Sequence, residues 1–194
     1  MTQLMPLFDT QITERISISR HDPAFTKGNC EKVLSDYLID SPKVAKVSNQ
    51  KKSGGARKSK VHPIPYTDES KWLYEFIADR AGRYNKYDFD FNLSGIYEEL
   101  QLIEYDEGDY YDYHMDMGDK ATAYRKLSVI IQLSDPDTYE GGDVVFNHGK
   151  EDTLPRDQGM FCVFPSYVLH KVTPVTKGKR YSLVSWIMSG SRFR

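Results

Sequence analysis

Closely spaced turn signals divide the second half of the chain, and this spacing constrains the fold more than any other feature. From Leu93 onward, short segments rich in β-branched and aromatic residues alternate with turn residues. The turns fall at Asp106–Gly108, Asp135–Asp137, Gly141-Gly142, Asn147–Gly149, Asp157–Gly159 and Lys177-Gly178. Such spacing is typical of an all-β sandwich or barrel rather than of βαβ units. We therefore expect a β jelly roll from about residue 93 to residue 194.

Helical patterns are confined to the first half of the chain. Apolar residues recur at helical spacing within residues 26–39, where Thr26 or Asn29 can serve as the N-cap. They recur again from about residue 68 to 85, where one apolar face is formed by Trp72, Leu73, Phe76, Ile77 and Ala81. We interpret residues 1–25 as strands and loop. The expected fold is mainly β with N-terminal helices, in a single domain over 1–194 whose residues 1–92 support a core over 93–194.

Length, charge and cysteine content exclude several classes of protein. A chain of 194 residues has the usual size of one domain. Its 26 basic and 28 acidic residues leave a net charge of −2, which disfavours a dedicated nucleic-acid-binding protein. Cys30 and Cys162 lie too far apart in sequence for a zinc ribbon, and two cysteines build no disulfide framework. The longest apolar run, Met160–Phe164, is far shorter than a membrane span, and the segment MTQLMPLFDT lacks an apolar signal core. We therefore expect a cytoplasmic protein without nucleic-acid or membrane partners.

Residues 41–60 differ in character from the rest of the chain. They contain seven Lys or Arg and no Asp or Glu, around Ser53-Gly54-Gly55. One interpretation is a solvated, mobile loop. The other is a cationic lid over a substrate, or a docking strip for an acidic partner.

The clearest chemical signal lies at His114, Asp116 and His170. If residues 113–116 form a strand, His114 and Asp116 point to the same side, about 7 Å apart at Cα. His170 follows 54 residues after Asp116. Two histidines and one carboxylate form the facial triad that holds Fe(II) in non-heme oxygenases and leaves positions for substrate and O₂. A His-x-Asp pair alone is common, so the assignment needs further support.

That support begins with Arg180, which stands ten residues after His170. A hairpin turning near residue 175 would place the two residues almost opposite each other. A guanidinium there can bind a carboxylate through two parallel hydrogen bonds, although an arginine at such a position is more often part of a surface ion pair. Arg180 begins an expected strand in which Ser182, Val184 and Trp186 share its face.

Tyrosines and one glutamine add polar groups to the same region. Gly108 permits a bend between Tyr105 and Tyr111, whose phenols can hydrogen-bond an anion, although strand tyrosines more often serve packing. The segment from Arg125 to Leu133 places apolar side chains on one face and Gln132 on the other. A buried Gln132 would need a polar partner, and a bound carboxylate is one candidate.

Taken together, these residues resemble the 2-oxoglutarate- and Fe(II)-dependent oxygenases, specifically the prolyl 4-hydroxylase-like branch that includes the bacterial PKHD-type hydroxylases. The resemblance is carried by Tyr105-x-x-Gly108-x-x-Tyr111-x-x-His114-x-Asp116, Glu140-Gly-Gly-Asp143, Phe164-Pro165, His170 and Gly178-x-Arg180-x-Ser182-Leu-Val-x-Trp186. Arg57-Lys-Ser59 and the Trp72 helix also have counterparts in that family. Separate motifs in one order and at these spacings make the resemblance specific.

The resemblance implies a double-stranded β-helix, which is a jelly-roll or cupin-like fold, with helices packed on one sheet. It implies that His114, Asp116 and His170 hold iron and that Arg180 binds the far carboxylate of 2-oxoglutarate. Tyr105 and Gln132 occupy positions whose counterparts contact this cosubstrate, and Trp186 would form a wall of the site. The implied reaction uses O₂, with ascorbate as a reductant, to hydroxylate a C–H bond while 2-oxoglutarate becomes succinate and CO₂.

Three functions remain open at this point. The leading one is hydroxylation of a protein or peptide side chain, with proline as one candidate. The second is a small-molecule hydroxylase acting on a free amino acid or similar metabolite. The third is a jelly-roll binding module without turnover, which retention of all four residues disfavours. The sequence does not indicate an oligomeric state.

The remaining histidines and acids are assigned no metal. We expect His148 at an exposed turn and His21 and His62 in loops beside prolines. The acids between residues 104 and 119 lack the spacing of a Ca²⁺ loop. We interpret five of them as a solvated rim: Asp106, Glu107, Asp109, Asp112 and Asp119.

Overall fold

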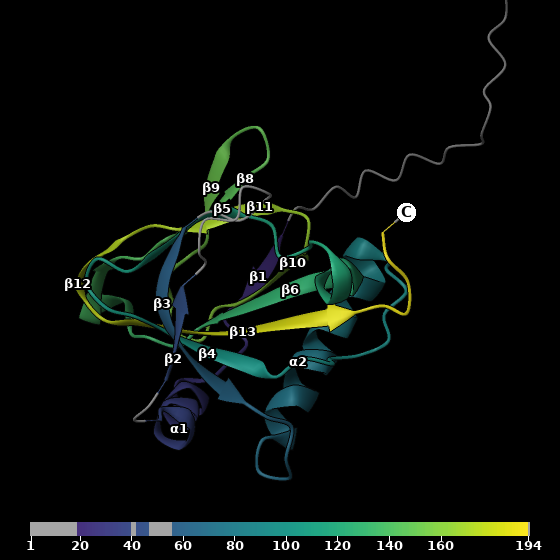
Figure 1. Ribbon diagram of the computed structural model, residues 1–194. Coiled ribbons are helices and arrows are strands. Elements are labelled where there is room, and N and C mark those ends of the chain that lie inside the picture. Colours follow the sequence, from purple (N-terminus) through teal and green to yellow (C-terminus); the bar gives the residue numbers. More distant parts are fainter. Residues whose placement is uncertain (1–18, 40–41, 47–55, 194) are drawn as a thin grey trace, which may run out of the picture.

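One antiparallel sheet that curls on itself forms most of the molecule (Figure 1). The computed structural model describes residues 19–39, 42–46 and 56–193. Eleven strands hydrogen-bond in the order β1-β10-β6-β13-β4-β3-β5-β11-β8-β9, with β2 paired to β3. Their bounds are β1 Arg20–Asp22, β2 Lys43–Lys46, β3 Arg57–Ile64, β4 Leu100–Tyr105, β5 Tyr110–His114, β6 Arg125–Gln132, β8 Val144–Asn147, β9 Glu151–Thr153, β10 Phe161–Pro165, β11 Leu169–Val172 and β13 Arg180–Met188. A separate pair is formed by β7 (Tyr139–Gly141) and β12 (Val175–Gly178).

Alternating side chains separate two apolar cores. On β6, Leu127, Val129 and Ile131 are buried in the core that faces the helices, whereas Ile130 belongs to the core inside the curl. On β13, Leu183 faces the helices and Val184 packs against the inner core. Because a strand turns successive residues to opposite faces, one strand serves both cores. The alternation expected for residues 125–133 is confirmed.

Two α-helices cover the outer face of the sheet, and their bounds agree closely with the expected segments. Helix α1 (Lys27–Tyr37) starts after Thr26, whose hydroxyl oxygen accepts a 3.2 Å hydrogen bond from the Asn29 N–H, so Thr26 is the N-cap. Helix α2 (Lys71–Tyr84) buries Leu73, Ile77 and Ala81 completely, with Trp72 and Phe76 packed beside them. A π-helical turn (Asn85–Phe89) and two 3₁₀ turns (Lys120–Tyr124, Pro136–Thr138) complete the elements.

Three local expectations in the first half differ from the structure. Within the basic stretch, residues 43–46 form β2 and residues 57–60 begin β3, while residues 47–55 lie outside the described part of the chain. The lid and loop interpretations of the segment 43–60 are therefore wrong for the two ends of this segment, which belong to the sheet. His62 lies in β3 rather than in a loop and is 2% exposed, because it hydrogen-bonds Glu104. His21 lies in β1.

The two cysteines are free thiols, and both are buried. Among the described residues, no helix combines the length and the apolar character needed to cross a bilayer.

Strands β1, β2 and β3 come from the first half of the chain yet pair into the same sheet as the later strands. The division of one domain at about residue 92 stays a prediction.

Candidate metal centre

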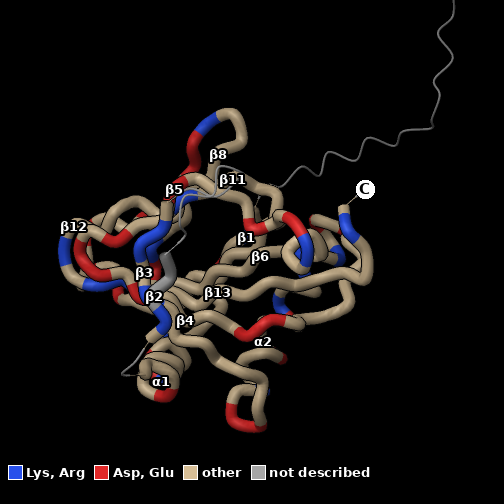
Figure 2. The backbone as a smooth tube through the Cα atoms, in the orientation of Figure 1, with Lys and Arg blue, Asp and Glu red and all other residues tan. Residues whose placement is uncertain are grey.

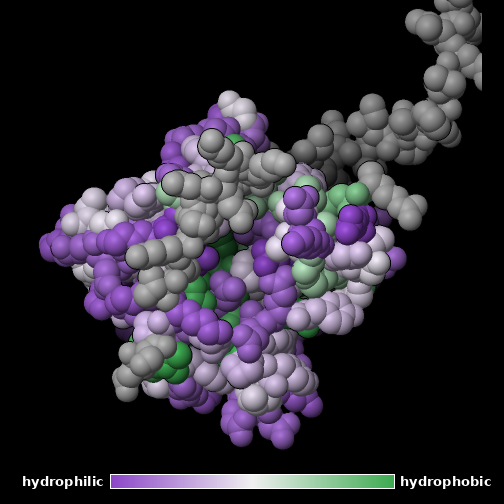
Figure 3. Space-filling model, viewed as in Figure 1, coloured by the Kyte–Doolittle hydropathy of each residue, from purple (hydrophilic) through white to green (hydrophobic). Residues whose placement is uncertain are grey.

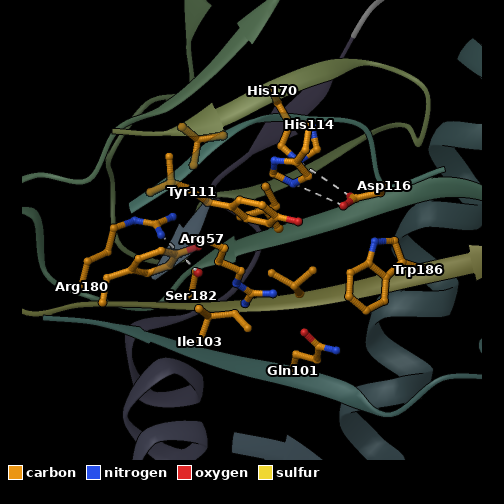
Figure 4. Close-up of a pocket in the computed structure, with 15 residues that line it drawn as sticks. Arg57, Gln101, Ile103, Tyr111, His114, Asp116, His170, Arg180, Ser182 and Trp186 are labelled. Atoms are coloured by element: carbon orange, nitrogen blue, oxygen red, sulfur yellow. Dashed lines mark hydrogen bonds and ion pairs between the residues drawn. The ribbon is translucent and has the colours of Figure 1, made fainter. Parts of the chain in front are cut away.

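His114, Asp116 and His170 converge on one point inside the curl (Figure 4). His114 is the last residue of β5, and His170 lies directly opposite it on β11. The Nε2 atom of His114 lies 3.5 Å from Oδ1 of Asp116, and Nε2 of His170 lies 3.7 Å from Oδ2. All three ligand atoms fall within 4.8 Å of one another, which is a spacing that one metal ion can bridge.

Backbone carbonyls fix which nitrogen of each imidazole faces this point. Nδ1 of His114 lies 2.8 Å from the carbonyl oxygen of Asp112, and Nδ1 of His170 lies 2.9 Å from that of Val168. A carbonyl oxygen can only accept, so each Nδ1 carries the proton and donates it. Each Nε2 is thereby left with a lone pair directed at Asp116. A hydrogen bond from the nitrogen that does not face the metal usually fixes the orientation of a metal-ligating histidine, and each Nδ1 donates such a bond here.

Burial sets the charges of the group. Burial lowers the pKa of His170 to about 4, so its imidazole is neutral near pH 7 and free to act as a ligand. Burial alone would raise the pKa of the Asp116 carboxyl. The nearby imidazoles of His170 and His114 and hydrogen bonding from Ser128 outweigh that effect, so the pKa is lowered and Asp116 is a carboxylate.

Aromatic rings and hydroxyls hold these ligands in place. The Tyr111 ring stacks on His114 at a centroid distance of 3.5 Å, and Phe164 meets His170 edge-on at 4.8 Å. Behind Asp116, the fully buried hydroxyls of Ser128 and Ser166 lie 3.0 Å apart. The ligand set is therefore preorganised in this structure.

The expectation that one strand carries both His114 and Asp116 is wrong. Strand β5 ends at His114, and Asp116 lies in the bend that follows. The Arg125 guanidinium donates a 3.1 Å hydrogen bond to the Asp116 backbone carbonyl. The side chain reaches the histidines because this bend is anchored, rather than through strand alternation.

Arg180 lines the same pocket as these three residues. Its side chain is only 1% exposed. Nη2 donates to Oε1 of Gln132 at 2.7 Å and Nη1 to Oγ of Ser182 at 3.3 Å, whereas Nε has no partner in the described part of the chain. No carboxylate of the described residues pairs with this guanidinium, so a buried cation faces the pocket without a counter-charge. Such a charge is costly unless an anion binds it.

The chain reaches Arg180 by a different route from the expected hairpin. Strand β11 pairs with β5 and β8, whereas β12 leaves to pair with β7, and β13 lies between β4 and β6. His170 and Arg180 thus lie on opposite walls of one pocket instead of on neighbouring strands. Gly142 permits this packing, since its φ is +65° and an added Cβ would lie 2.8 Å from Cδ of Arg180.

The pocket combines these polar groups with apolar walls. Arg180, Ser182, Val184 and Trp186 all line it, which confirms that they share one face of β13. Figure 3 shows a hollow in the middle of this side of the molecule, with hydrophobic residues in its depth and hydrophilic residues around it. Its lining comprises Arg57, Gln101, Ile103, Tyr105, Tyr111, His114, Asp116, Ile130, Val144, His170, Val172, Arg180, Ser182, Val184 and Trp186.

Both tyrosines singled out in the sequence also line the pocket. The turn between them has Gly108 at φ +78°, as a bend there requires. Burial raises the pKa of Tyr111 to about 12 and also raises that of Tyr105. Both phenols therefore stay protonated and can donate hydrogen bonds.

Gln132 is buried behind the pocket rather than in its lining. Its Oε1 accepts a hydrogen bond from Arg180, and its Nε2 has no partner among the described residues, so a contact with a bound carboxylate stays a prediction. Arg57 and Gln101 line the pocket but were not among the site residues expected from the sequence. The Arg57-Lys-Ser59 motif was the available signal for Arg57.

Part of the expected acidic rim is buried or paired instead of solvated. Asp109 is 4% exposed and pairs with Lys58 at 2.8 Å. Asp106 pairs with Lys60 and Lys179, whose hydrogen bonds lower its pKa to about 2. Basic and acidic segments lie side by side around β3 and β12 (Figure 2). The exposed positions of Glu107, Asp112, Asp119 and His148 are as expected.

The donor set fits an iron ion. Two neutral imidazoles and one carboxylate on one side of a point form the 2-His-1-carboxylate arrangement that suits Fe(II) and leaves its other positions open. His21, His62 and His148, all within the described residues, lie outside this group. The unpartnered donors of Arg180 supply a second observation, because they point to an anionic ligand in the same pocket.

Comparison with known proteins shows which family this arrangement resembles. Residues 100–188, which include the metal trio and Arg180, match the model of the 2OG-Fe(II) oxygenase superfamily. This match covers somewhat less than half of the chain, so it shows that the segment is similar to that superfamily. A PKHD-type hydroxylase of Synechococcus sp. (strain CC9605) is 39% identical over 103 residues, which cover 51% of this chain and 46% of that protein. A PKHD-type hydroxylase of Idiomarina loihiensis is 35% identical over 91 residues, covering 46% and 42%. The chain thus spans less than half the length of these oxygenase relatives.

Solved structures share the fold of this chain. A prolyl-4-hydroxylase of Pseudomonas putida matches with a TM-score of 0.68 at 17% identity, over 91% of this chain and 95% of that one. A prolyl hydroxylase from Trichoplax adhaerens, in complex with a peptide fragment of hypoxia inducible factor, matches with 0.71 at 16% identity, over 90% and 84%. The epimerase SnoN from nogalamycin biosynthesis also matches, with 0.69 at 14% identity, over 92% and 80%. The double-stranded β-helix fold is confirmed, and because an epimerase shares it, the fold alone does not define the reaction.

Proposed function

We propose that this protein is an Fe(II)- and 2-oxoglutarate-dependent dioxygenase that hydroxylates a C–H bond of a protein or peptide side chain. The observation that carries the proposal is the pairing of two features in one pocket. A preorganised metal trio occupies one wall, and a buried arginine without a carboxylate partner among the described residues occupies another. A metal together with a carboxylate ligand explains both features at once.

Each residue then has a defined role. His114, Asp116 and His170 would hold the iron, and Arg180 would bind the far carboxylate of 2-oxoglutarate through its free N–H groups. Gln132 positions the guanidinium through its 2.7 Å hydrogen bond. Bound iron and 2-oxoglutarate supply the oxidation of a C–H bond by O₂, coupled to formation of succinate and CO₂.

The remaining pocket residues orient the ligands and exclude water. Apolar side chains from four strands, Ile103, Ile130, Val144 and Val184, separate the polar groups. Trp186 forms a wall on which the Arg125 guanidinium stacks at 3.6 Å from the ring centroid. Tyr105 lies under Arg180, at 5.3 Å from its guanidinium carbon, and can donate to an anion bound there.

The peptide substrate and the reductant are part of the same proposal. The Trichoplax relative, which is described with a bound peptide, supports a peptide substrate, and the two prolyl hydroxylases support proline as its target. A free amino acid or similar metabolite remains the alternative. Ascorbate as reductant and a cytoplasmic location stay predictions from the sequence.

Turnover of 2-oxoglutarate tests the proposed function. Succinate formed by the purified protein should require both Fe(II) and 2-oxoglutarate, should rise when the substrate is added, and should vanish in Asp116→Ala. Proline-containing peptides and free amino acids would be compared as stimulants. Tight binding of Fe(II) and 2-oxoglutarate without any succinate would overturn the enzymatic proposal in favour of a binding module.

A further inference from the structure

A second arginine faces the pocket without a counter-charge among the described residues. Arg57, the first residue of β3, extends into the pocket between Tyr111 and Gln101 (Figure 4). Its Nε donates a 2.8 Å hydrogen bond to Oγ of Ser59, and its guanidinium lies over the Tyr111 ring at 4.9 Å from the centroid. These contacts fix the plane of the guanidinium, and within the described part of the chain no residue accepts a hydrogen bond from its Nη groups.

Arg57 differs in this respect from the cations around it. Arg125, which stacks on the pocket residue Trp186, forms an ion pair with Glu98. Lys58 and Lys60, its neighbours on β3, pair with Asp109 and Glu104. No carboxylate of the described residues pairs with Arg57, and the adjacent segment 47–55 contains no Asp or Glu in the sequence.

The charge balance of the pocket indicates that Arg57 lacks an anionic partner among the described residues. Apart from the two histidines of the metal trio, the charged side chains among the described lining residues are Arg57, Arg180 and Asp116. Under the proposed function, the two charges of Fe(II) are matched by those of 2-oxoglutarate, and Asp116 balances Arg180. One positive charge, that of Arg57, then remains unmatched in a half-buried position where water screens it poorly.

We infer that the primary substrate carries a carboxylate and that Arg57 binds it, an inference that rests on the proposed function. The rigid fork of a guanidinium matches a carboxylate through two parallel hydrogen bonds, which a neutral carbonyl group does not offer. The carboxylate can be the α-carboxylate of a free amino acid or an acidic group of a peptide near the reacting residue. Arg57 is thus a specificity-determining residue. Arg180 binds the carboxylate of 2-oxoglutarate, and Arg57 binds that of the substrate.

Matched probe pairs test this inference directly. One pair is a proline-containing peptide with Glu beside the proline and the same peptide with Gln, and the other is free L-proline and L-prolinamide. Binding of each probe is measured by calorimetry without O₂, on protein saturated with Fe(II) and 2-oxoglutarate, so that no turnover is needed. We expect one carboxylate probe to bind about 10- to 100-fold more tightly than its amide, and the pair that shows this identifies the source of the carboxylate.

Variants assign the preference to Arg57. Arg57→Gln should abolish the difference within the pair, whereas Arg57→Lys should keep only part of it because an ammonium lacks the planar fork. Lys177→Gln removes the same charge from an exposed ion pair with Glu140 and should leave the preference intact.

Two kinds of failure are distinguishable. Loss of Fe(II) or 2-oxoglutarate binding in the unsubstituted protein would overturn the proposed function. Normal loading with equal or absent binding of the acidic and amide probes would overturn only the role of Arg57. Weakened 2-oxoglutarate binding in Arg57→Gln, with probe preference unchanged, would also overturn it by assigning Arg57 to the cosubstrate.

Discussion

Replacing Arg180 by alanine separates 2-oxoglutarate binding from metal binding. Arg180 is 1% exposed, and among the described residues its guanidinium donates only to Gln132 and Ser182, so its remaining N–H groups are available to the cosubstrate. Removing one partner of a buried, hydrogen-bonded charge pair costs about 2–5 kcal/mol of binding free energy. We therefore expect the 2-oxoglutarate dissociation constant to rise about 30- to 5,000-fold.

The same substitution should change the free energy of unfolding far less. It leaves the Gln132 and Ser182 side chains without a partner, at about 1–3 kcal/mol each. It also removes a buried cation that lacks a counter-charge among the described residues, which offsets much of that cost. Arg180→Lys keeps the charge but loses the planar fork, so its 2-oxoglutarate affinity should be intermediate.

Calorimetric titration measures the affinities for the metal and for 2-oxoglutarate, and urea unfolding of the metal-free protein measures the free energy of unfolding. The metal affinity of Arg180→Ala should stay close to that of the unsubstituted protein, since Arg180 donates to none of the three metal-site side chains. Equal losses of metal and 2-oxoglutarate affinity would refute this reasoning and assign Arg180 a role in folding.

Three further substitutions test other parts of the structure. Asp116→Ala should lose metal affinity and succinate formation while its circular dichroism spectrum stays unchanged, and retained turnover would contradict the metal assignment. Gly142→Ala should lose about 1–3 kcal/mol of unfolding free energy and bind 2-oxoglutarate more weakly, because its φ is +65° and the new Cβ would meet Arg180; an unchanged urea midpoint would contradict this. Lys60 and Lys179 hold the pKa of Asp106 at about 2, below its ordinary value of 3.8, so this carboxylate stabilises the fold above pH 4 and the contribution is lost as pH falls toward 2. Asp106→Asn should therefore reduce the loss of unfolding free energy between pH 4 and about 2. An unchanged pH dependence in this range would show that solvent screens this ion pair.

The strand pattern made much of the fold predictable. Alternation along residues 125–133 and 180–186 indicated which side chains face the pocket, and backbone alternation is a local property that the sequence records directly. Gly108 and Gly142 marked turns whose positive φ values the structure confirms. The Thr26 cap was predictable for the same local reason.

Long-range pairing accounts for what could not be predicted. The segment between His170 and Arg180 has the turn residues of a hairpin, yet β12 pairs with β7, a choice that depends on residues 139–141. His62 lies beside a proline, which suggests a loop, but Glu104 on the neighbouring strand holds it in the sheet. The partner of Gln132 is Arg180, 48 positions away. In each case the deciding contact joins residues distant in sequence.

The central claim is that the metal trio and Arg180 hold Fe(II) and 2-oxoglutarate together. Its most direct test is anaerobic titration of the metal-free protein with both ligands, followed through the visible metal-to-ligand charge-transfer band, with His114→Ala as control. We expect a charge-transfer band that saturates near one equivalent of iron in the unsubstituted protein and is missing in His114→Ala. A folded protein that shows no band at saturating ligand would contradict it.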